Sequence, residues 1–238
     1  MFCQQCGNTL DPDVVFCPAC GRQRTVVAGN TPPPLPIGNA IIPAIPFRPP
    51  VPIKATGGQW ISQAWEVVKT DVGLFMGMTV VYLVIGSAGS VLTQGPMQVG
   101  FHLACMKKLI RGRMEIGDLL QGFNYFVAAF VAALIIALFA FAGFLFCIIP
   151  GLVVSAIYMF TYLFVVDKRL EFWPAMQASH ALVKNDYVGF TLFFLGLGIL
   201  NFIGILCCII GLLVTIPISI MAVTIAYREL VGFEPDTV

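Results

Sequence analysis

Four cysteines near the N-terminus are the residues of this sequence best suited to chemistry. They form two Cys-x-x-Cys units, each followed by glycine, with ten residues between the second and the third cysteine. Two residues between the thiolates let the chain fold back so that both sulfurs reach one ion, and the following glycine relieves crowding in the turn. Four thiolates complete a tetrahedral Zn²⁺ shell and leave no open position for a substrate. The spacing therefore predicts a structural zinc site formed by Cys3, Cys6, Cys17 and Cys20.

Residues 1–24, which hold these cysteines, are too few to form an adequate hydrophobic core. Metal binding would therefore supply most of the folding free energy of the segment. The first residues lack the basic start and apolar stretch of a cleavable signal peptide, which predicts that this end of the chain stays in the cytoplasm. Thiols remain reduced there, so paired cysteines favour metal. Unmetallated thiols or disulfides are the alternative.

The charges of the cysteine segment argue against nucleic acid as its partner. A zinc module that binds nucleic acid needs a basic or aromatic face. Here Arg22 and Arg24 are accompanied by Asp11 and Asp13. We therefore expect a cytoplasmic protein partner, or a purely structural role, for this segment.

The rest of the chain is too apolar for a water-soluble globule. Of its 238 residues, 58% are hydrophobic and 11% are charged, whereas soluble domains average about 25% charged residues. The charges fall in a few short stretches, so lipid must solvate the long apolar runs between them. Nine prolines in residues 25–58 exclude a continuous helix there. They predict an extended tether, which acts as a spacer or as a docking site for proline-binding domains.

Six apolar runs follow the tether. A membrane helix needs roughly 20 apolar residues to cross about 30 Å of hydrocarbon, and three of the runs meet that length unaided. The run that starts at Pro96 is the weakest, because it includes Gln98 and His102. The runs are Val72–Leu92, Pro96–Met106, Tyr125–Ile149, Gly151–Val166, Val188–Ile210 and Gly211–Tyr227.

An internal repeat supports the weak run. Residues 96–110 align without gaps on residues 217–231, and both are predicted to be helices that begin after a proline. The simplest account is three units of similar plan. Each unit has an amphipathic segment, a long apolar helix, a turn and a returning helix. The units are 58–112, 113–170 and 171–232.

These units predict an all-α fold. We expect a six-helix transmembrane domain over residues 59–232, made of three helical hairpins with interfacial amphipathic helices, and a tail at 233–238.

Each unit is predicted to meet the membrane through its amphipathic segment. Apolar residues recur there at helical spacing, and a tryptophan at the start of a stripe suits the headgroup level, where its N–H is hydrated. We interpret the segments as helices lying in the interface. The alternative is that each forms the first turns of a longer membrane helix. The stripes are Trp60, Ile61, Ala64, Trp65 and Val68; Ile116, Leu119, Leu120 and Phe123; and Phe172, Ala175, Met176, Ser179, Leu182 and Val183.

Basic residues mark one end of the predicted hairpins. The turns at Thr93–Gly95, at Cys147–Gly151 and around Gly211 carry no charge. By the positive-inside rule, the basic ends face the cytoplasm together with both termini. This predicts a multi-pass protein of the inner (plasma) membrane. The basic residues at the open ends are Lys69, Lys107, Lys108, Arg111, Arg113, Lys168, Arg169, Lys184 and Arg228.

The apolar runs give no indication of catalysis. An intramembrane enzyme needs a nucleophile with a base, or an acid–base pair. Cys105 follows His102 by three residues, but no acid is present to orient the pair. His102 and Asn201 are instead predicted to make hydrogen bonds between helices, and Gly73 with Gly77 forms a GxxxG pattern that would allow close helix packing. We therefore predict that the chain is not an enzyme.

Two resemblances accompany these patterns. The segment MFCQQCGNTLDPDVVFCPACGRQ resembles the small zinc ribbons at the N-termini of many bacterial membrane proteins, which implies that its four cysteines bind zinc. More loosely, residues 58–232 are similar to six-helix bacterial membrane families and to the membrane domain of some glycerophosphodiester phosphodiesterases, which carry their chemistry in a separate soluble domain. The matching features are Gly95-Pro96, Leu109-Ile110-Arg111-Gly112, Ile149-Pro150-Gly151, Trp173-Pro174-Ala175 and Ala226-Tyr227-Arg228.

The expected role is therefore that of a non-catalytic membrane scaffold or adaptor, whose zinc ribbon meets a cytoplasmic partner. A transporter or channel for a small or lipid-like solute is the alternative.

We predict one zinc per chain in the purified protein, and its loss in Cys6→Ser, because three thiolates leave the tetrahedral shell incomplete. Cys147→Ser, which lies outside the motif, should keep its zinc. Metal analysis by mass spectrometry measures both. Stoichiometric zinc in Cys6→Ser would rule out the four-ligand site.

Overall fold

The computed structural model describes residues 54–89, 91–207 and 210–234. The chain divides into two units, Met1–Pro43 and Ala44–Val238. All described residues belong to the second unit, to which the following account is confined. The predicted ribbon at 1–24 lies outside the described residues, as does nearly all of the predicted tether.

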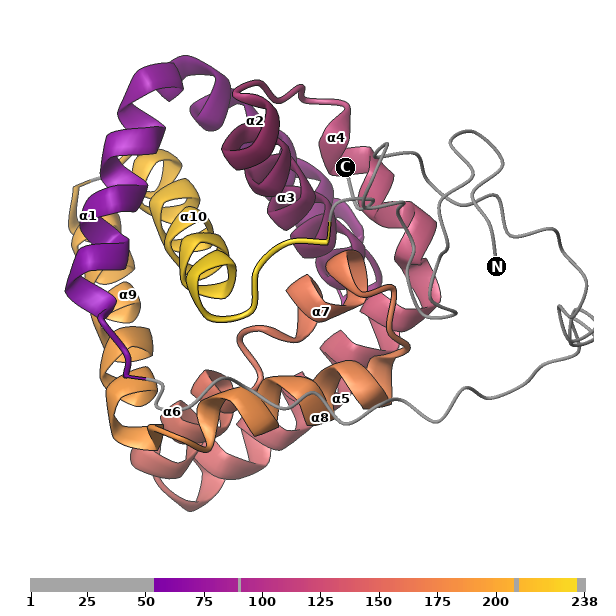
Figure 1. Ribbon diagram of the computed structural model, residues 1–238, viewed down its shortest axis with the longest axis vertical. Helices are drawn as coiled ribbons and strands as arrows, with labels where there is room; N and C mark the ends of the chain where they lie inside the picture. Colours follow the sequence, from indigo (N-terminus) through magenta and orange to yellow (C-terminus); the bar gives the residue numbers. More distant parts are fainter. Residues whose placement is uncertain (1–53, 90, 208–209, 235–238) are drawn as a thin grey trace, which may run out of the picture. The chain divides into compact units, whose positions relative to one another are not determined.

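The described residues form helices and no strand (Figure 1), in agreement with the predicted all-α class. The α-helices are α1 Gly57–Val68, α2 Val72–Gly89, α3 Val91–Arg111, α4 Asp118–Gln121, α5 Phe126–Phe146, α6 Ile148–Ile157, α7 Thr161–Asp167, α8 Phe172–Val183, α9 Tyr187–Leu206 and α10 Leu212–Leu230. Two 3-10 turns, η1 Lys69–Asp71 and η2 Gly122–Tyr125, lead into α2 and α5.

The order of these helices follows the three units of the sequence. A shorter helix comes first in each unit (α1, α4 or α8), a long apolar helix second (α2, α5 or α9), and a returning segment third (α3, α6 with α7, or α10). The long helix packs against the returning one in every unit. How these pairs are arranged across a bilayer stays a prediction.

The predicted starts of two returning helices are wrong. Helix α3 begins at Val91 and α10 at Leu212, so Pro96 and Pro217 lie inside them, each five residues after the start. A proline removes one intrahelical hydrogen bond. Ending the helix would expose several backbone groups, which lipid cannot satisfy. Thr93–Gly95, predicted to be a turn, is consequently helical.

Helices α3 and α10 lie at the centre of the helical unit. Helix α3 contacts α2, α4, α5, α7 and α10, and α10 also contacts α1, α2 and α9. Large side chains from both helices are fully buried, among them Met97, Phe101 and Met106 of α3 and Met221 and Tyr227 of α10. The two segments that the repeat relates are therefore the two core helices.

Five helical stretches in the described part are long and apolar enough to cross a membrane, rather than the six predicted. Helix α3 is the difference, since it carries Gln94, Gln98 and His102. A helix enclosed by other helices can place polar groups toward the protein interior, where they meet partners rather than lipid. The stretches are Gly57–Ser87, Asp118–Phe146, Ile148–Asp167, Tyr187–Leu206 and Leu212–Leu230.

Exposed apolar side chains gather on α5, on the start of α6 and on α9. So many exposed apolar side chains on long helices are rare on water-soluble proteins and typical of contact with lipid. These residues are Val127, Leu134, Leu138, Phe139, Phe141, Phe144, Leu145, Phe146, Ile148, Ile149, Val188, Leu192, Leu195, Ile199, Phe202, Ile203, Ile205 and Leu206.

The predicted amphipathic segments are confirmed in part. Helix α8 buries the predicted face, including Ala175, Met176 and Leu182. Helix α1 buries Trp60, Ala64 and Val68 of its stripe, but Trp65 is exposed. The Trp60 N–H is not hydrated as predicted: the ring is buried and its Nε1 donates to Glu229 Oε2 at 2.6 Å. The stripe at 116–123 gives only the four-residue α4 followed by η2, and it does not form one buried face, because Leu119 is buried whereas Ile116 and Leu120 are exposed.

Close helix packing occurs at glycines other than the predicted pair. A Cβ added to Gly73 would meet nothing within 4 Å, and one on Gly77 would meet a single side chain at 3.9 Å. In contrast, a Cβ on Gly100 would lie 1.9 Å from the backbone oxygen of Leu119, and one on Gly122 would lie 2.1 Å from that of Pro96. The contact between α3 and the α4–η2 segment therefore requires glycine on both sides.

We predict that Gly100→Ala lowers stability by at least about 1–3 kcal/mol, because backbone must move to admit the methyl group. Gly73→Ala is the matched control on an open helix surface, and it should be neutral or slightly stabilising, since alanine favours helix. Thermal unfolding in detergent compares the two. Equal unfolding temperatures for the two variants would contradict the close approach at Gly100.

Candidate functional site

The predicted zinc ligands Cys3, Cys6, Cys17 and Cys20 lie outside the described residues, so the structure does not test them. Within the described ranges, no group of three or more His, Cys, Asp or Glu side chains is placed to hold a metal ion. The donor set itself fits zinc, because four thiolates in two Cys-x-x-Cys units are the ligands of structural zinc sites.

A hydrogen-bonded cluster joins the two core helices. His102 of α3 is 2% exposed, and its Nδ1 lies 3.0 Å from Thr224 Oγ1 of α10. The Thr224 hydroxyl donates to the Ile220 carbonyl at 2.8 Å. Its oxygen is therefore the acceptor for His102, which assigns the ring proton to Nδ1 and leaves Nε2 as an acceptor. Cys105, the other residue of the predicted His102–Cys105 pair, is fully buried and lies near the same Thr224.

A second cluster joins α9 to α10. Asn201 Nδ2 donates to the Leu197 carbonyl at 2.9 Å and to Ser219 Oγ at 2.8 Å. Ser219 in turn donates to the Thr215 carbonyl. The prediction that His102 and Asn201 form hydrogen bonds between helices is confirmed.

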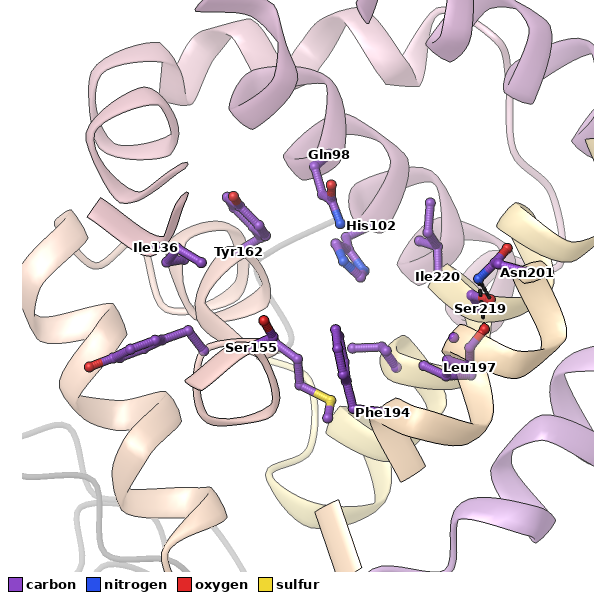
Figure 2. A pocket seen from close by; sticks show the side chains of 14 residues that line it. Gln98, His102, Ile136, Ser155, Tyr162, Phe194, Leu197, Asn201, Ser219 and Ile220 are labelled. Atoms are coloured by element: carbon purple, nitrogen blue, oxygen red, sulfur yellow. Dashed lines mark hydrogen bonds between the residues drawn. The ribbon is translucent and has the colours of Figure 1, made fainter. Parts of the chain in front are cut away.

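Both clusters border a cavity of about 350 Å³ (Figure 2). Its lining comes from α3, α5, α6, α7, α9 and α10 and from the α6–α7 connection. The polar side chains of the lining are Gln98, His102, Ser155, Tyr158, Tyr162, Asn201 and Ser219. The remaining lining is apolar apart from Gly198, and no Asp, Glu, Lys or Arg takes part in it among the described residues.

Sequence reasoning missed the polar residues of the run Gly151–Val166, which line the cavity. Ser155, Tyr158 and Tyr162 follow one another at i, i+3 and i+7, the spacing of one helix face. That polar stripe within an otherwise apolar span was the available signal.

No charged side chain of the described residues lines the cavity, and several of them form ion pairs elsewhere. Asp118, which is buried, accepts from Lys107 and from the Glu115 N–H, and Lys108 pairs with Asp71. These bonds connect the end of α3 with the starts of α2 and α4.

A third group of charges surrounds the end of α7. Asp167 is buried and accepts from the Tyr227 hydroxyl and the Glu234 N–H, both at 2.9 Å. Lys168 pairs with Asp167 and Glu234. Burial opposes the charge of Lys168, but the bonds to the two carboxylates outweigh it and raise the pKa of this amine above its ordinary value.

Comparison with known proteins supports the zinc ribbon. A family described as a zinc-ribbon domain matches residues 2–23, a range that includes all four predicted ligands. The chain is also similar to uncharacterised proteins of Mycobacterium bovis and Mycobacterium tuberculosis, at 31% identity over 102 residues. That alignment covers 43% of this chain and 31% of each relative, so the chain spans about a third of the length of these proteins.

No solved structure matches the chain. The matches also give no support to the resemblance with the membrane domain of glycerophosphodiester phosphodiesterases. The ribbon is thus the part of the predicted resemblance that the comparisons support.

We predict that Thr224→Val destabilises the protein by roughly 1–3 kcal/mol, because it leaves the buried His102 Nδ1 without its partner. Thr79→Val is the matched control: Thr79 is also fully buried, but its hydroxyl bonds only to the Phe75 carbonyl of its own helix. Unfolding in detergent should show a clearly lower midpoint for Thr224→Val. Similar midpoints would argue that the α3–α10 hydrogen bond contributes nothing.

Proposed function

We propose that this protein is a non-catalytic scaffold or adaptor of the bacterial inner (plasma) membrane. The zinc ribbon binds a cytoplasmic protein, and the proline-rich tether joins it to the helical membrane domain. The observation that carries the proposal is the zinc-ribbon match over residues 2–23, in a unit separate from the helices. A closed four-cysteine site stabilises a small fold and offers no position for a reacting group.

The proposed topology has six spans, with both termini in the cytoplasm. Five stretches are apolar enough to cross by themselves, and α3, held among them, supplies the sixth. Paired charges support this placement, because the ends of α3 and α7 and the starts of α2 and α4 all carry them. The positive-inside rule assigns that side to the cytoplasm.

The bond between His102 Nδ1 and Thr224 supports the non-catalytic role, because it gives the His102 ring a part in holding α3 against α10.

Transport of a small or lipid-like solute is the second candidate function, and the polar-lined cavity is the observation that favours it. Flux measured in liposomes that contain the purified protein separates it from the adaptor role, which requires no solute movement.

We predict that residues 58–238 insert and unfold like the full chain but capture fewer cytoplasmic proteins. The reason is that helices in lipid depend on their own hydrogen bonds and packing, whereas the ribbon depends on its metal. Pull-down with the full chain and with residues 58–238, and with a full-length Cys6→Ser chain as the control for ribbon folding, measures the loss. Equal capture by all three would refute the adaptor role.

A further inference from the structure

We propose that the cavity beside α3, α6, α9 and α10 binds a neutral, hydroxyl-bearing amphiphile of the size of a medium-chain alcohol. This inference does not depend on the adaptor role, and it would give the transport alternative a class of solute.

The size of the cavity sets the first limit on its ligand. About 350 Å³ lies within the range of roughly 300–1,000 Å³ that is typical of ligand pockets. At about 30 Å³ for each water-sized group, it holds about a dozen such groups. A ten-carbon chain with one polar end has that size.

The polar side of the lining offers hydrogen bonds that the protein leaves open. His102 Nε2 has no hydrogen-bond partner among the described residues, because the ring bonds to Thr224 through Nδ1. Ser155 donates its proton to the Gly151 carbonyl at 2.9 Å, which leaves its oxygen free to accept. Figure 2 shows the His102 ring directed into the cavity and the Ser155 oxygen at its border.

Gln98 adds the complementary group. Its Oε1 lies 3.3 Å from the Tyr82 hydroxyl, which donates to it. The amide nitrogen, with two N–H donors, then remains available on the side where Figure 2 shows it next to His102. An acceptor on His102 beside a donor on Gln98 matches a hydroxyl group, which both donates and accepts.

The rest of the lining selects an apolar chain. Met159, Phe194, Leu197, Ile220 and Val223 contribute hydrocarbon and no strong hydrogen-bonding group. The ligand must therefore be amphiphilic, with an apolar chain as well as a hydroxyl group.

Charge excludes ionic head groups. A carboxylate or phosphate would face the lone pairs of His102 and Ser155 without a cation in the described lining to balance it. An ammonium group would likewise meet no carboxylate there. An unpaired charge enclosed among helices is costly, so the ligand is neutral.

Photo-cross-linking of the full chain in lipid nanodiscs with a diazirine-bearing decanol tests the proposal. Mass spectrometry should locate the label on lining peptides of α6, α9 or α10. Excess 1-decanol should reduce that labelling at least tenfold, whereas equal concentrations of decane, decanoate or decylammonium should leave it nearly unchanged. Competition by decane would show that the cavity binds hydrocarbon without recognising a hydroxyl group, which would refute the proposal. Competition by decanoate or decylammonium would refute the conclusion that the ligand is neutral.

Two variants locate the site. Gly198→Leu fills the cavity from a lining position where an added Cβ meets nothing within 4 Å, and His102→Leu removes the proposed acceptor. Both should lose labelling at least tenfold, and Gly73→Leu, also at an open position, should keep it. Because Gly198→Leu alters none of the hydrogen bonds, its unfolding temperature should match that of Gly73→Leu. Undiminished labelling in Gly198→Leu would overturn the proposal. Failure of the ribbon pull-down would leave this test unaffected.

Discussion

The absence of water from the hydrocarbon of a membrane is the constraint on which the helical domain depends. Every backbone polar group at that depth must find its partner within the protein, and a buried side-chain polar group without one is costly. Helices α3 and α10 continue through Pro96 and Pro217 for this reason, and His102 and Asn201 are bonded to neighbouring helices. Ionised groups are the costliest of all to bury, and those of Lys107, Lys108 and Lys168 lie at or next to helix ends and are paired there.

The same constraint explains why polar side chains from several helices are found together around one cavity. Helices α5 and α9 expose apolar side chains and carry few strong polar groups. The enclosed helix α3 can hold Gln98 and His102, because α10 and the α6–α7 segment shield it from lipid. The low hydropathy of α3 and the polarity of the cavity therefore both follow from the position of α3 among the other helices.

The features that sequence alone predicted are those that depend on local spacing. The all-α class, the order of the three units and the buried face of α8 follow from hydrophobic periodicity. The errors arose where contacts between distant segments decide the outcome. Trp60 bonds to Glu229 rather than water, and Gly100 rather than Gly73 meets a neighbouring backbone. A GxxxG pattern shows that small residues share a helix face, but not that another helix lies against it. The same limit applies to His102. The sequence predicted that this residue bonds to another helix, but it did not identify Thr224 as the partner.

Two kinds of free energy stabilise the two parts of the chain, and this bears on how they can cooperate. Metal coordination supports a ribbon of this size, whereas close packing and internal hydrogen bonds support helices in lipid. Coupling between a cavity ligand and a ribbon partner would require a contact that differs between two states of the protein. The sequence of residues 25–58, with nine prolines, predicts an extended tether. Such a tether limits the distance between the ribbon and the helices, but it does not transmit changes in packing from one to the other. In the proposed adaptor, the membrane domain would therefore determine where the ribbon acts, and the occupancy of the cavity would not change what the ribbon binds.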